Sequence, residues 1–145
     1  MTHTAPGVTE AARFVLASNS PRRRELLQAL KIPLVILAPG EESSSGQIDE
    51  TPRPGEAPGH LVQRLSRAKA KAVLPRLAAQ PQNDAAEPHI IIAADTVVVL
   101  DNQILGKPAT PAAAVSMLQA LRGRAHFVYS GLTIARYPPP GPAGS

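Results

Sequence analysis

The stretch "HIIIAADTVVVLDNQIL" (89–105) decides the fold of this chain, because it predicts the centre of a sheet. Residues 89–94 form a continuous apolar run, which is typical of a central strand buried on both faces. A second apolar run (97–100) follows Asp95-Thr96 and leads into residues 103–105. The intervening Asp101-Asn102 pair favours a two-residue β-hairpin turn.

Helices and strands alternate on both sides of this stretch. Ser20 and Pro21 are good helix-starting residues, as are Thr110 and Pro111, and Gly123 is positioned to end a helix. The remaining elements are expected to be strands at 14–18, 33–37 and 126–135, the last interrupted at Ser130-Gly131, and helices at 20–30, 61–77 and from 110. The predicted fold is an α/β domain with a mixed sheet flanked by helices. Inward-facing positions are expected at Leu26, Leu27, Leu30, Ala114, Val115, Leu118 and Leu121.

Composition limits the class of protein. The chain has 145 residues, of which 43% are apolar and 3% aromatic, so one domain with an aliphatic core is expected. The sequence has no cysteine, which excludes disulfides and thiolate metal sites. Because no apolar run approaches the length of a membrane span, we expect a cytoplasmic protein without a membrane partner. Its predicted organisation is a disordered tail (1–12), one domain (13–136) and a disordered Pro/Gly-rich tail (137–145).

Three consecutive arginines open the first predicted helix in "LASNSPRRRELL" (16–27). Cations are unfavourable at a helix N-terminus, where free N–H groups and the helix dipole attract anions instead. The unfavourable placement is offset if a phosphate lies between the arginine side chains and the backbone amides. The alternative is that Arg22, Arg23 and Arg24 are ordinary solvated helix residues.

Lys69 and Asp95 are charged residues in apolar surroundings. Lys69 falls inside the apolar arc of its helix, near Leu65 and Val73, whereas Arg64, Arg67 and Lys71 are expected on the opposite, solvated face. It either extends to the rim of the core or meets an anion in a pocket. Asp95 follows a buried run, where an aspartate can cap a turn, hold a divalent ion or activate a water.

Two further charges complete the candidate set. Lys107 follows a glycine in "GKP" (106–108), which is not a P-loop, and Glu50 lies in the long Pro/Gly-rich loop (39–59). Together, the cations and carboxylates suit a nucleoside triphosphate with Mg²⁺, the cations holding phosphates while the acids hold metal and orient water.

Five stretches resemble the Maf-type nucleoside triphosphate pyrophosphatases, in that family's order. They are "LASNSPRRRELL" (16–27), "IDETPRPGEAP" (48–58), "RLSRAKAKAV" (64–73), "AADTVVVLDNQILGKP" (93–108) and "MLQALRGRAHFVYSGLTI" (117–134). The resemblance implies an α/β fold with a deep cleft. It also implies a hydrolase that splits a nucleoside triphosphate between its α and β phosphates, assisted by Mg²⁺ or Mn²⁺, and it allows a homodimer.

The resemblance also implies roles for individual residues. Asp95 matches the catalytic aspartate and presumed proton acceptor, and together with Glu50 it would hold the metal. The "ADT" form is similar to the branch acting on dTTP and UTP. Glu50 matches the acidic residue of the family's "DE" loop and counts, with Lys69 and Lys107, among the catalytic residues that the resemblance implies. The other matches are Ser18, Arg22 and Arg23 as the phosphate-binding motif, and Arg22 and Thr96 as positions linked to base choice.

Two departures from the family pattern leave alternatives. The loop before Glu50 is longer than usual, and Glu41 and Glu42 compete for its role. The family's second half, with a "GGYAIQG"-like segment, is absent, so we expect an incomplete domain truncated at the C-terminus. A catalytically impaired, non-catalytic nucleotide-binding or regulatory module is therefore the alternative function. A nucleic-acid binder is a third interpretation, supported only by the sequence pI of about 10.0 and the arginine run but opposed by the scarcity of aromatics for stacking.

Overall fold

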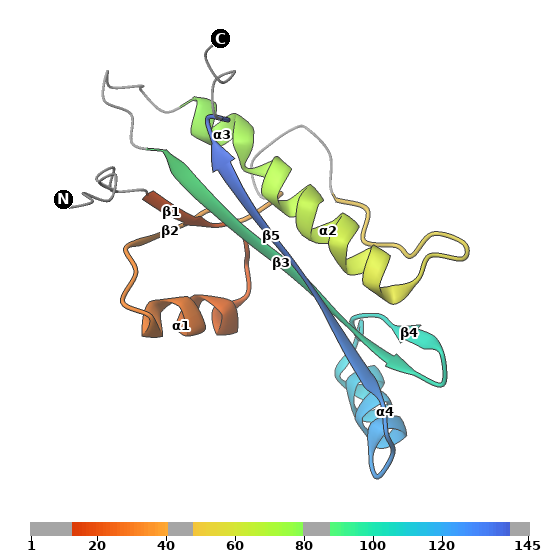
Figure 1. Ribbon diagram of the computed structural model, residues 1–145. Coiled ribbons are helices and arrows are strands. Elements are labelled where there is room, and N and C mark those ends of the chain that lie inside the picture. The colour runs from red at the N-terminus through yellow and green to blue at the C-terminus, as the bar shows by residue number, and fades with distance from the viewer. Residues whose placement is uncertain (1–12, 41–47, 80–87, 140–145) are drawn as a thin grey trace, which may run out of the picture.

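The computed structural model describes residues 13–40, 48–79 and 88–139 and shows the predicted mixed α/β architecture (Figure 1). The expected N-terminal tail and most of the C-terminal tail lie outside these residues, and the last strand ends at Tyr137. The elements in chain order are β1 (Arg13–Leu16), α1 (Pro21–Ala29), β2 (Leu34–Ile36), α2 (Pro58–Ala72), α3 (Leu74–Ala78), β3 (His89–Leu100), β4 (Gln103–Leu105), α4 (Pro111–Leu121) and β5 (Phe127–Tyr137).

The five strands form one mixed sheet around β3. On one side of β3, β1 pairs in parallel with its first part, with Leu16 opposite Ile92, and β4 pairs antiparallel with its last part, from Val98 on. β2 extends the sheet beyond β1, also in parallel. β5 pairs antiparallel along nearly the whole other side of β3, from His89 to Val99.

β3 is one strand of twelve residues, not the two runs that the sequence suggested. Asp95 and Thr96, expected at a break, lie inside it, because β5 supplies a continuous partner on that side. The predicted hairpin into β4 is confirmed, since Asp101 and Asn102 adopt positive φ angles of 49° and 61°. Two left-handed residues match the twist of the flanking strands, and Asp and Asn tolerate this conformation best after glycine.

The core lies between one face of the sheet and the helices α2 and α3. Val15, Ile91 and Ala93 of the sheet pack against Ala70 and the end of α2. The predicted helix over 61–77 begins earlier, at Pro58, and is divided at Val73 into α2 and α3. Pro75 explains the division, because a proline has no N–H to continue the helical ladder.

β5 is continuous, so the expected interruption at Ser130-Gly131 was wrong. Gly131 serves a different purpose, which is the close approach of α2 to the sheet. A Cβ atom at this position would lie 2.3 Å from the carbonyl oxygen of Val62. Next to this contact, the hydroxyls of Ser66 and Thr133 are 2.8 Å apart. The glycine therefore sets the distance between α2 and the strand pair β3–β5.

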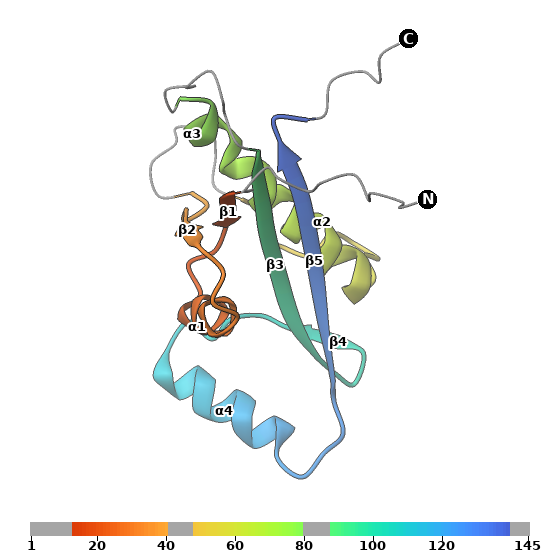
Figure 2. The same ribbon diagram turned by 60° about the vertical axis from the view of Figure 1, so that its left-hand side comes forward.

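The leucines near α1 and the apolar residues of α4 were expected to face the core, and this was wrong, since none of them is buried and only Leu27, Ala114 and Leu121 are half-buried. Neither helix has a buried residue, and Leu30 and Leu118 are 63% and 67% exposed. Figure 2 shows the reason for α4, which stands away from the sheet at the end of β4 and β5. Helical spacing predicts which side chains share a stripe, but not whether another element covers that stripe. None of the helices in the described ranges is long and apolar enough to cross a membrane.

Gly131→Ala is expected to destabilise the fold, because the added methyl group must displace the backbone of α2. We expect a loss of about 1–3 kcal/mol in the free energy of unfolding, measured by urea denaturation. Gly59→Ala is the matched control, since nothing lies within 4 Å of its position in α2 and helical alanine is favoured over glycine. Equal stability of the two variants would contradict the close-approach role of Gly131.

Candidate functional site

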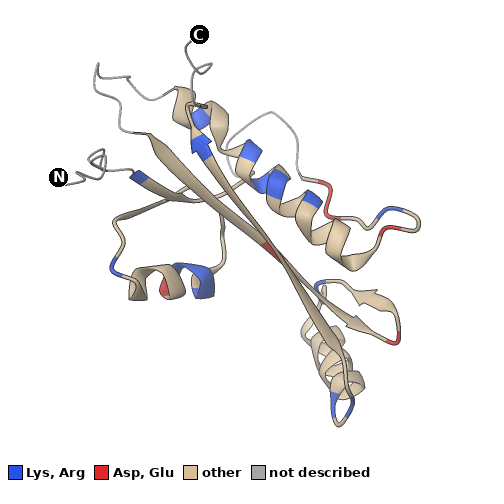
Figure 3. Cartoon of the chain, in the orientation of Figure 1, with Lys and Arg blue, Asp and Glu red and all other residues tan. Residues whose placement is uncertain are grey.

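The candidate site lies where the parallel strand β1 ends beside the middle of β3. On this side β1 accompanies β3 only as far as Ile92, and β4 begins at Val98. Among the described residues, the stretch between them therefore has no neighbouring strand on that side, and Asp95 lies in it. The carboxyl ends of parallel strands are where open α/β sheets bind ligands. Figure 3 shows an acidic segment, coloured red, within β3, the strand that contains Asp95.

Lys69 joins two carboxylates that come from distant parts of the chain. Its Nζ lies 2.5 Å from Oδ1 of Asp95 and 2.9 Å from Oε1 of Glu50. Lys69 and Asp95 are both buried, at 8% and 6% exposure. The interpretation that Lys69 merely extends to the rim of the core is therefore wrong. An unpaired buried charge is costly, so Lys69 and Asp95 can both be buried only because they pair with each other.

Glu50 is held by a second lysine. Its Oε2 accepts a hydrogen bond from Nζ of Lys107 at 3.1 Å, while Oε1 faces Lys69. The hydrogen bond from Lys69 lowers the pKa of Glu50 below its ordinary 4.5, and Lys107 lowers it further, although partial burial opposes the shift. Glu50 therefore stays a carboxylate through the neutral pH range.

The segment between β1 and α1 forms another wall of the site. Ser18 Oγ accepts a hydrogen bond from the backbone N–H of Ser20, and Ser20 Oγ caps α1 by accepting from the N–H of Arg23. The guanidinium of Arg23 donates to Thr96 Oγ1 at 3.2 Å, so the start of α1 is tied to β3. The helix N-terminus and its arginine thus face the same space as the Lys69 cluster, a favourable arrangement for an anion.

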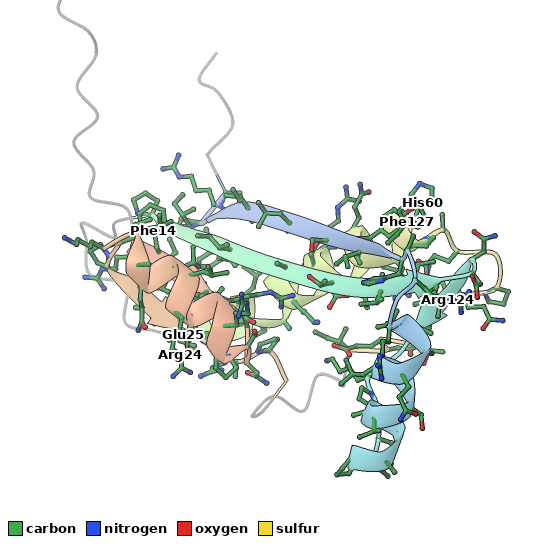
Figure 4. All side chains as sticks on the ribbon, turned by 90° about the horizontal axis from the view of Figure 1, so that it is seen from below. Phe14, Arg24, Glu25, His60, Arg124 and Phe127 are labelled. Atoms are coloured by element: carbon green, nitrogen blue, oxygen red, sulfur yellow. The ribbon has the colours of Figure 1, made fainter. Side chains whose placement is uncertain are left out.

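A cavity of about 750 Å³ joins these groups. Ser18, Arg23, Glu50, Lys69, Asp95, Thr96 and Lys107 all line it. Arg22 does not, and it is exposed on α1. Arg24 and its neighbour Glu25 point away from the sheet (Figure 4), as expected for solvated helix residues. The competing residues Glu41 and Glu42 lie outside the described part of the chain.

Ser130 and Arg64 are residues of this region that the sequence did not predict as parts of the site. Ser130 Oγ lies 2.9 Å from Thr96 Oγ1, because the two residues are paired between β3 and β5. Arg64, expected to face water, instead binds the segment that carries Glu50. The contact between Ser130 and Thr96 follows only from the register of β5 on β3. The contacts of Arg64 follow only from the path of the long loop.

A divalent cation at this site would depend on Glu50 and Asp95. Within the described ranges, no group of three or more His, Cys, Asp or Glu side chains could hold a metal ion. Two carboxylates bridged by one ammonium nevertheless fit Mg²⁺, which in proteins is usually bound by one or two carboxylates together with phosphate oxygens of a substrate. The donor set therefore suits a metal that arrives with a phosphorylated ligand.

The fold and site define a class: an α/β domain with a cavity lined by both basic and acidic side chains at the carboxyl end of a parallel strand. The comparison with protein families narrows this class, since residues 13–141 match the family model described as Maf-like protein. The chain belongs to this family.

Relatives from several bacteria are similar to the chain. Proteins named dTTP/UTP pyrophosphatase are 45% identical over 119 residues in Burkholderia thailandensis, 40% over 126 in Aromatoleum aromaticum and 44% over 133 in Burkholderia pseudomallei. The matched segments cover 82%, 86% and 91% of this chain, but 54%, 59% and 59% of those proteins. The chain thus spans between half and three fifths of the relatives that it matches.

Lys69→Met is expected to raise the pKa of Glu50, because it removes the strongest hydrogen bond and leaves the effect of burial. Lys107→Met should raise this pKa less. In the unsubstituted protein, the stability contributed by the lowered pKa is present above pH 4.5 and is lost as the pH falls through the lowered value. Carbon-13 NMR titration of the Glu50 carboxyl checks both variants, and a larger shift in Lys107→Met would contradict the assignment.

Proposed function

We propose that this chain is a nucleoside triphosphate pyrophosphatase that releases pyrophosphate and a nucleoside monophosphate. The observation that carries the proposal is the Lys69 ammonium held between Glu50 and Asp95 inside a cavity also lined by Arg23 and Lys107. The family membership and the names of the relatives support the same activity.

The basic side chains account for binding of the triphosphate. Arg23 can present a planar fork to two phosphate oxygens, and Lys107, which is largely exposed, can turn toward an incoming anion. The N-terminus of α1 adds backbone N–H groups at the same wall of the cavity. Three cationic side chains, counting Lys69, thus face two carboxylates, and the excess favours an anionic ligand.

The reaction that we propose is attack of water on the α phosphorus. Asp95 accepts a proton from the attacking water, whose oxygen forms a new bond to phosphorus. The bond between the α phosphorus and the bridging oxygen breaks, and pyrophosphate leaves with the electron pair. Lys69 fixes the Asp95 carboxylate through Oδ1 and so orients it toward the cavity.

Mg²⁺ or Mn²⁺ is the cofactor that we propose, held by Glu50 and Asp95 with the substrate's phosphates. When bound, the metal would polarise the α phosphate and neutralise charge that develops on it. The chain's own contribution is to keep both carboxylates side by side through Lys69, which prevents the two like charges from separating.

We propose dTTP and UTP as substrates, because the relatives are named for them and Thr96 stands after Asp95 as in that branch. The Thr96 hydroxyl accepts a hydrogen bond from the guanidinium of Arg23 and lies 2.9 Å from Oγ of Ser130. These two contacts fix its position at the cavity wall. A cytoplasmic location and a homodimer stay predictions from the sequence.

Asp95→Asn tests the proposed function. The amide keeps the shape and a hydrogen-bond acceptor for Lys69 but cannot take the proton of water. We expect pyrophosphate release from dTTP or UTP with Mg²⁺ to fall by about 10²–10⁴-fold. Asp101→Asn is the matched control, because Asp101 pairs with Arg124 at an exposed turn and asparagine tolerates its positive φ.

The outcomes separate two functions. Equal rates in the original chain and Asp95→Asn would remove Asp95 from the mechanism. Tight binding of a non-hydrolysable dTTP analogue by calorimetry, without any product from dTTP or UTP, would favour a non-catalytic nucleotide-binding module instead.

A further inference from the structure

Arg64 makes more contacts than a solvated residue of α2 needs. Its Nε and Nη2 donate to the two carboxylate oxygens of Glu56, at 2.7 and 2.9 Å. Nη1 donates to the carbonyl of Asp49 at 3.2 Å, and Nη2 also donates to the carbonyl of Thr51 at 3.0 Å. One guanidinium thus contacts three residues of the loop that precedes α2.

The two carbonyls are those of the residues on either side of Glu50. Fixing both of them fixes the backbone from which the Glu50 side chain extends toward Lys69 and Lys107. Thr51 also closes a local turn, since its N–H donates to Asp49 Oδ1 at 2.9 Å. The segment is therefore held at the point where it must deliver a carboxylate to the cavity.

Glu56 completes the arrangement from the other end of the segment. Besides accepting from Arg64, its Oε2 accepts from the N–H of Arg53 at 3.0 Å. These contacts lower the pKa of Glu56 to about 2, with the hydrogen bond from Arg64 as the main cause. Glu56 therefore stays charged, and the fork of Arg64 keeps its partner across the neutral range.

An ordinary surface ion pair would not hold a loop, because exposed pairs contribute about 0–1 kcal/mol. This pair differs in geometry and exposure. The side chains of Arg64 and Glu56 are 21% and 10% exposed, and the contact uses both oxygens of the acid. Arg67 of the same helix is exposed, and the described residues give it no hydrogen bond or ion pair, which makes it a natural reference.

We propose that Arg64 is a positioning residue that clamps residues 49–56 onto α2 and so delivers Glu50 to Lys69 and Asp95. Arg64 lies five residues before Lys69 on the same helix, so α2 carries both the clamp and the lysine that Glu50 must meet. The role requires the planar fork, because only arginine can donate to Glu56 and both carbonyls at once. The inference rests on the proposed function where it concerns catalysis.

The first test measures position without any turnover. Arg64→Met should speed amide hydrogen exchange over residues 48–57 by about tenfold or more, while exchange in the rest of α2 and in β3 stays unchanged. Arg67→Met is the matched control and should leave the 48–57 segment as protected as before. Unchanged protection of this segment in Arg64→Met would overturn the clamp.

The second test measures the consequence for the reaction. Arg64→Met should lower kcat for pyrophosphate release by about 10–100-fold, because a small displacement of the Glu50 carboxylate from its productive position strongly lowers the rate. In the Glu50→Gln background the same substitution should have no further effect on kcat. Arg64→Lys keeps the charge but not the fork, and wild-type kcat in this variant would overturn the proposal.

The two proposals fail separately. Absence of pyrophosphate release by the unsubstituted chain would overturn the proposed function, and the exchange measurement would still decide whether Arg64 positions the segment. Normal turnover by the unsubstituted chain, with additive effects of Arg64→Met and Glu50→Gln, would overturn the positioning role alone.

Discussion

The contact on which the site depends is the ammonium of Lys69 between two carboxylates. It joins α2, β3 and the long loop at a single point, with Nζ 2.5 Å from Asp95 and 2.9 Å from Glu50. The buried Asp95 and the nearby Glu50 would repel each other without it, and the lysine would be an unpaired buried charge without them. The positive charge of Lys69 and the negative charges of the two carboxylates thus hold the site together. Its geometry depends on the packing of α2 on the sheet, because α2 carries Lys69.

That packing is controlled by small contacts rather than by large side chains. Gly131, opposite Asp95 in the β3–β5 ladder, allows the backbone of α2 at Val62 to approach the sheet. A side chain there would push away the helix that carries Lys69. The sequence presents this glycine as a break in a strand, but its effect is to bring a lysine and an aspartate within hydrogen-bond distance.

The cavity has two walls with different chemistry. The Lys69 cluster supplies the carboxylates, whereas the β1–α1 segment supplies a helix N-terminus and Arg23. Thr96 connects them, because it follows Asp95 in β3 and accepts a hydrogen bond from Arg23. An arginine run at a helix start, unfavourable by itself, is therefore reasonable where it borders a space for an anion. Only Arg23 of the run takes this position.

The sequence by itself determined the α/β class, the hairpin at Asp101-Asn102 and seven of the twelve cavity-lining residues. These features are local. Periodicity, helix caps and turn residues act within a few positions, and charged residues in apolar runs can be recognised from the sequence alone. Tertiary structure alone decided that Arg22 lies outside the cavity and that Arg64 binds a loop. It also decided that Leu26, Leu30 and Leu118 stay exposed. The physical reason is that a helical pattern fixes the direction of each side chain, but only the path of distant segments decides what meets it.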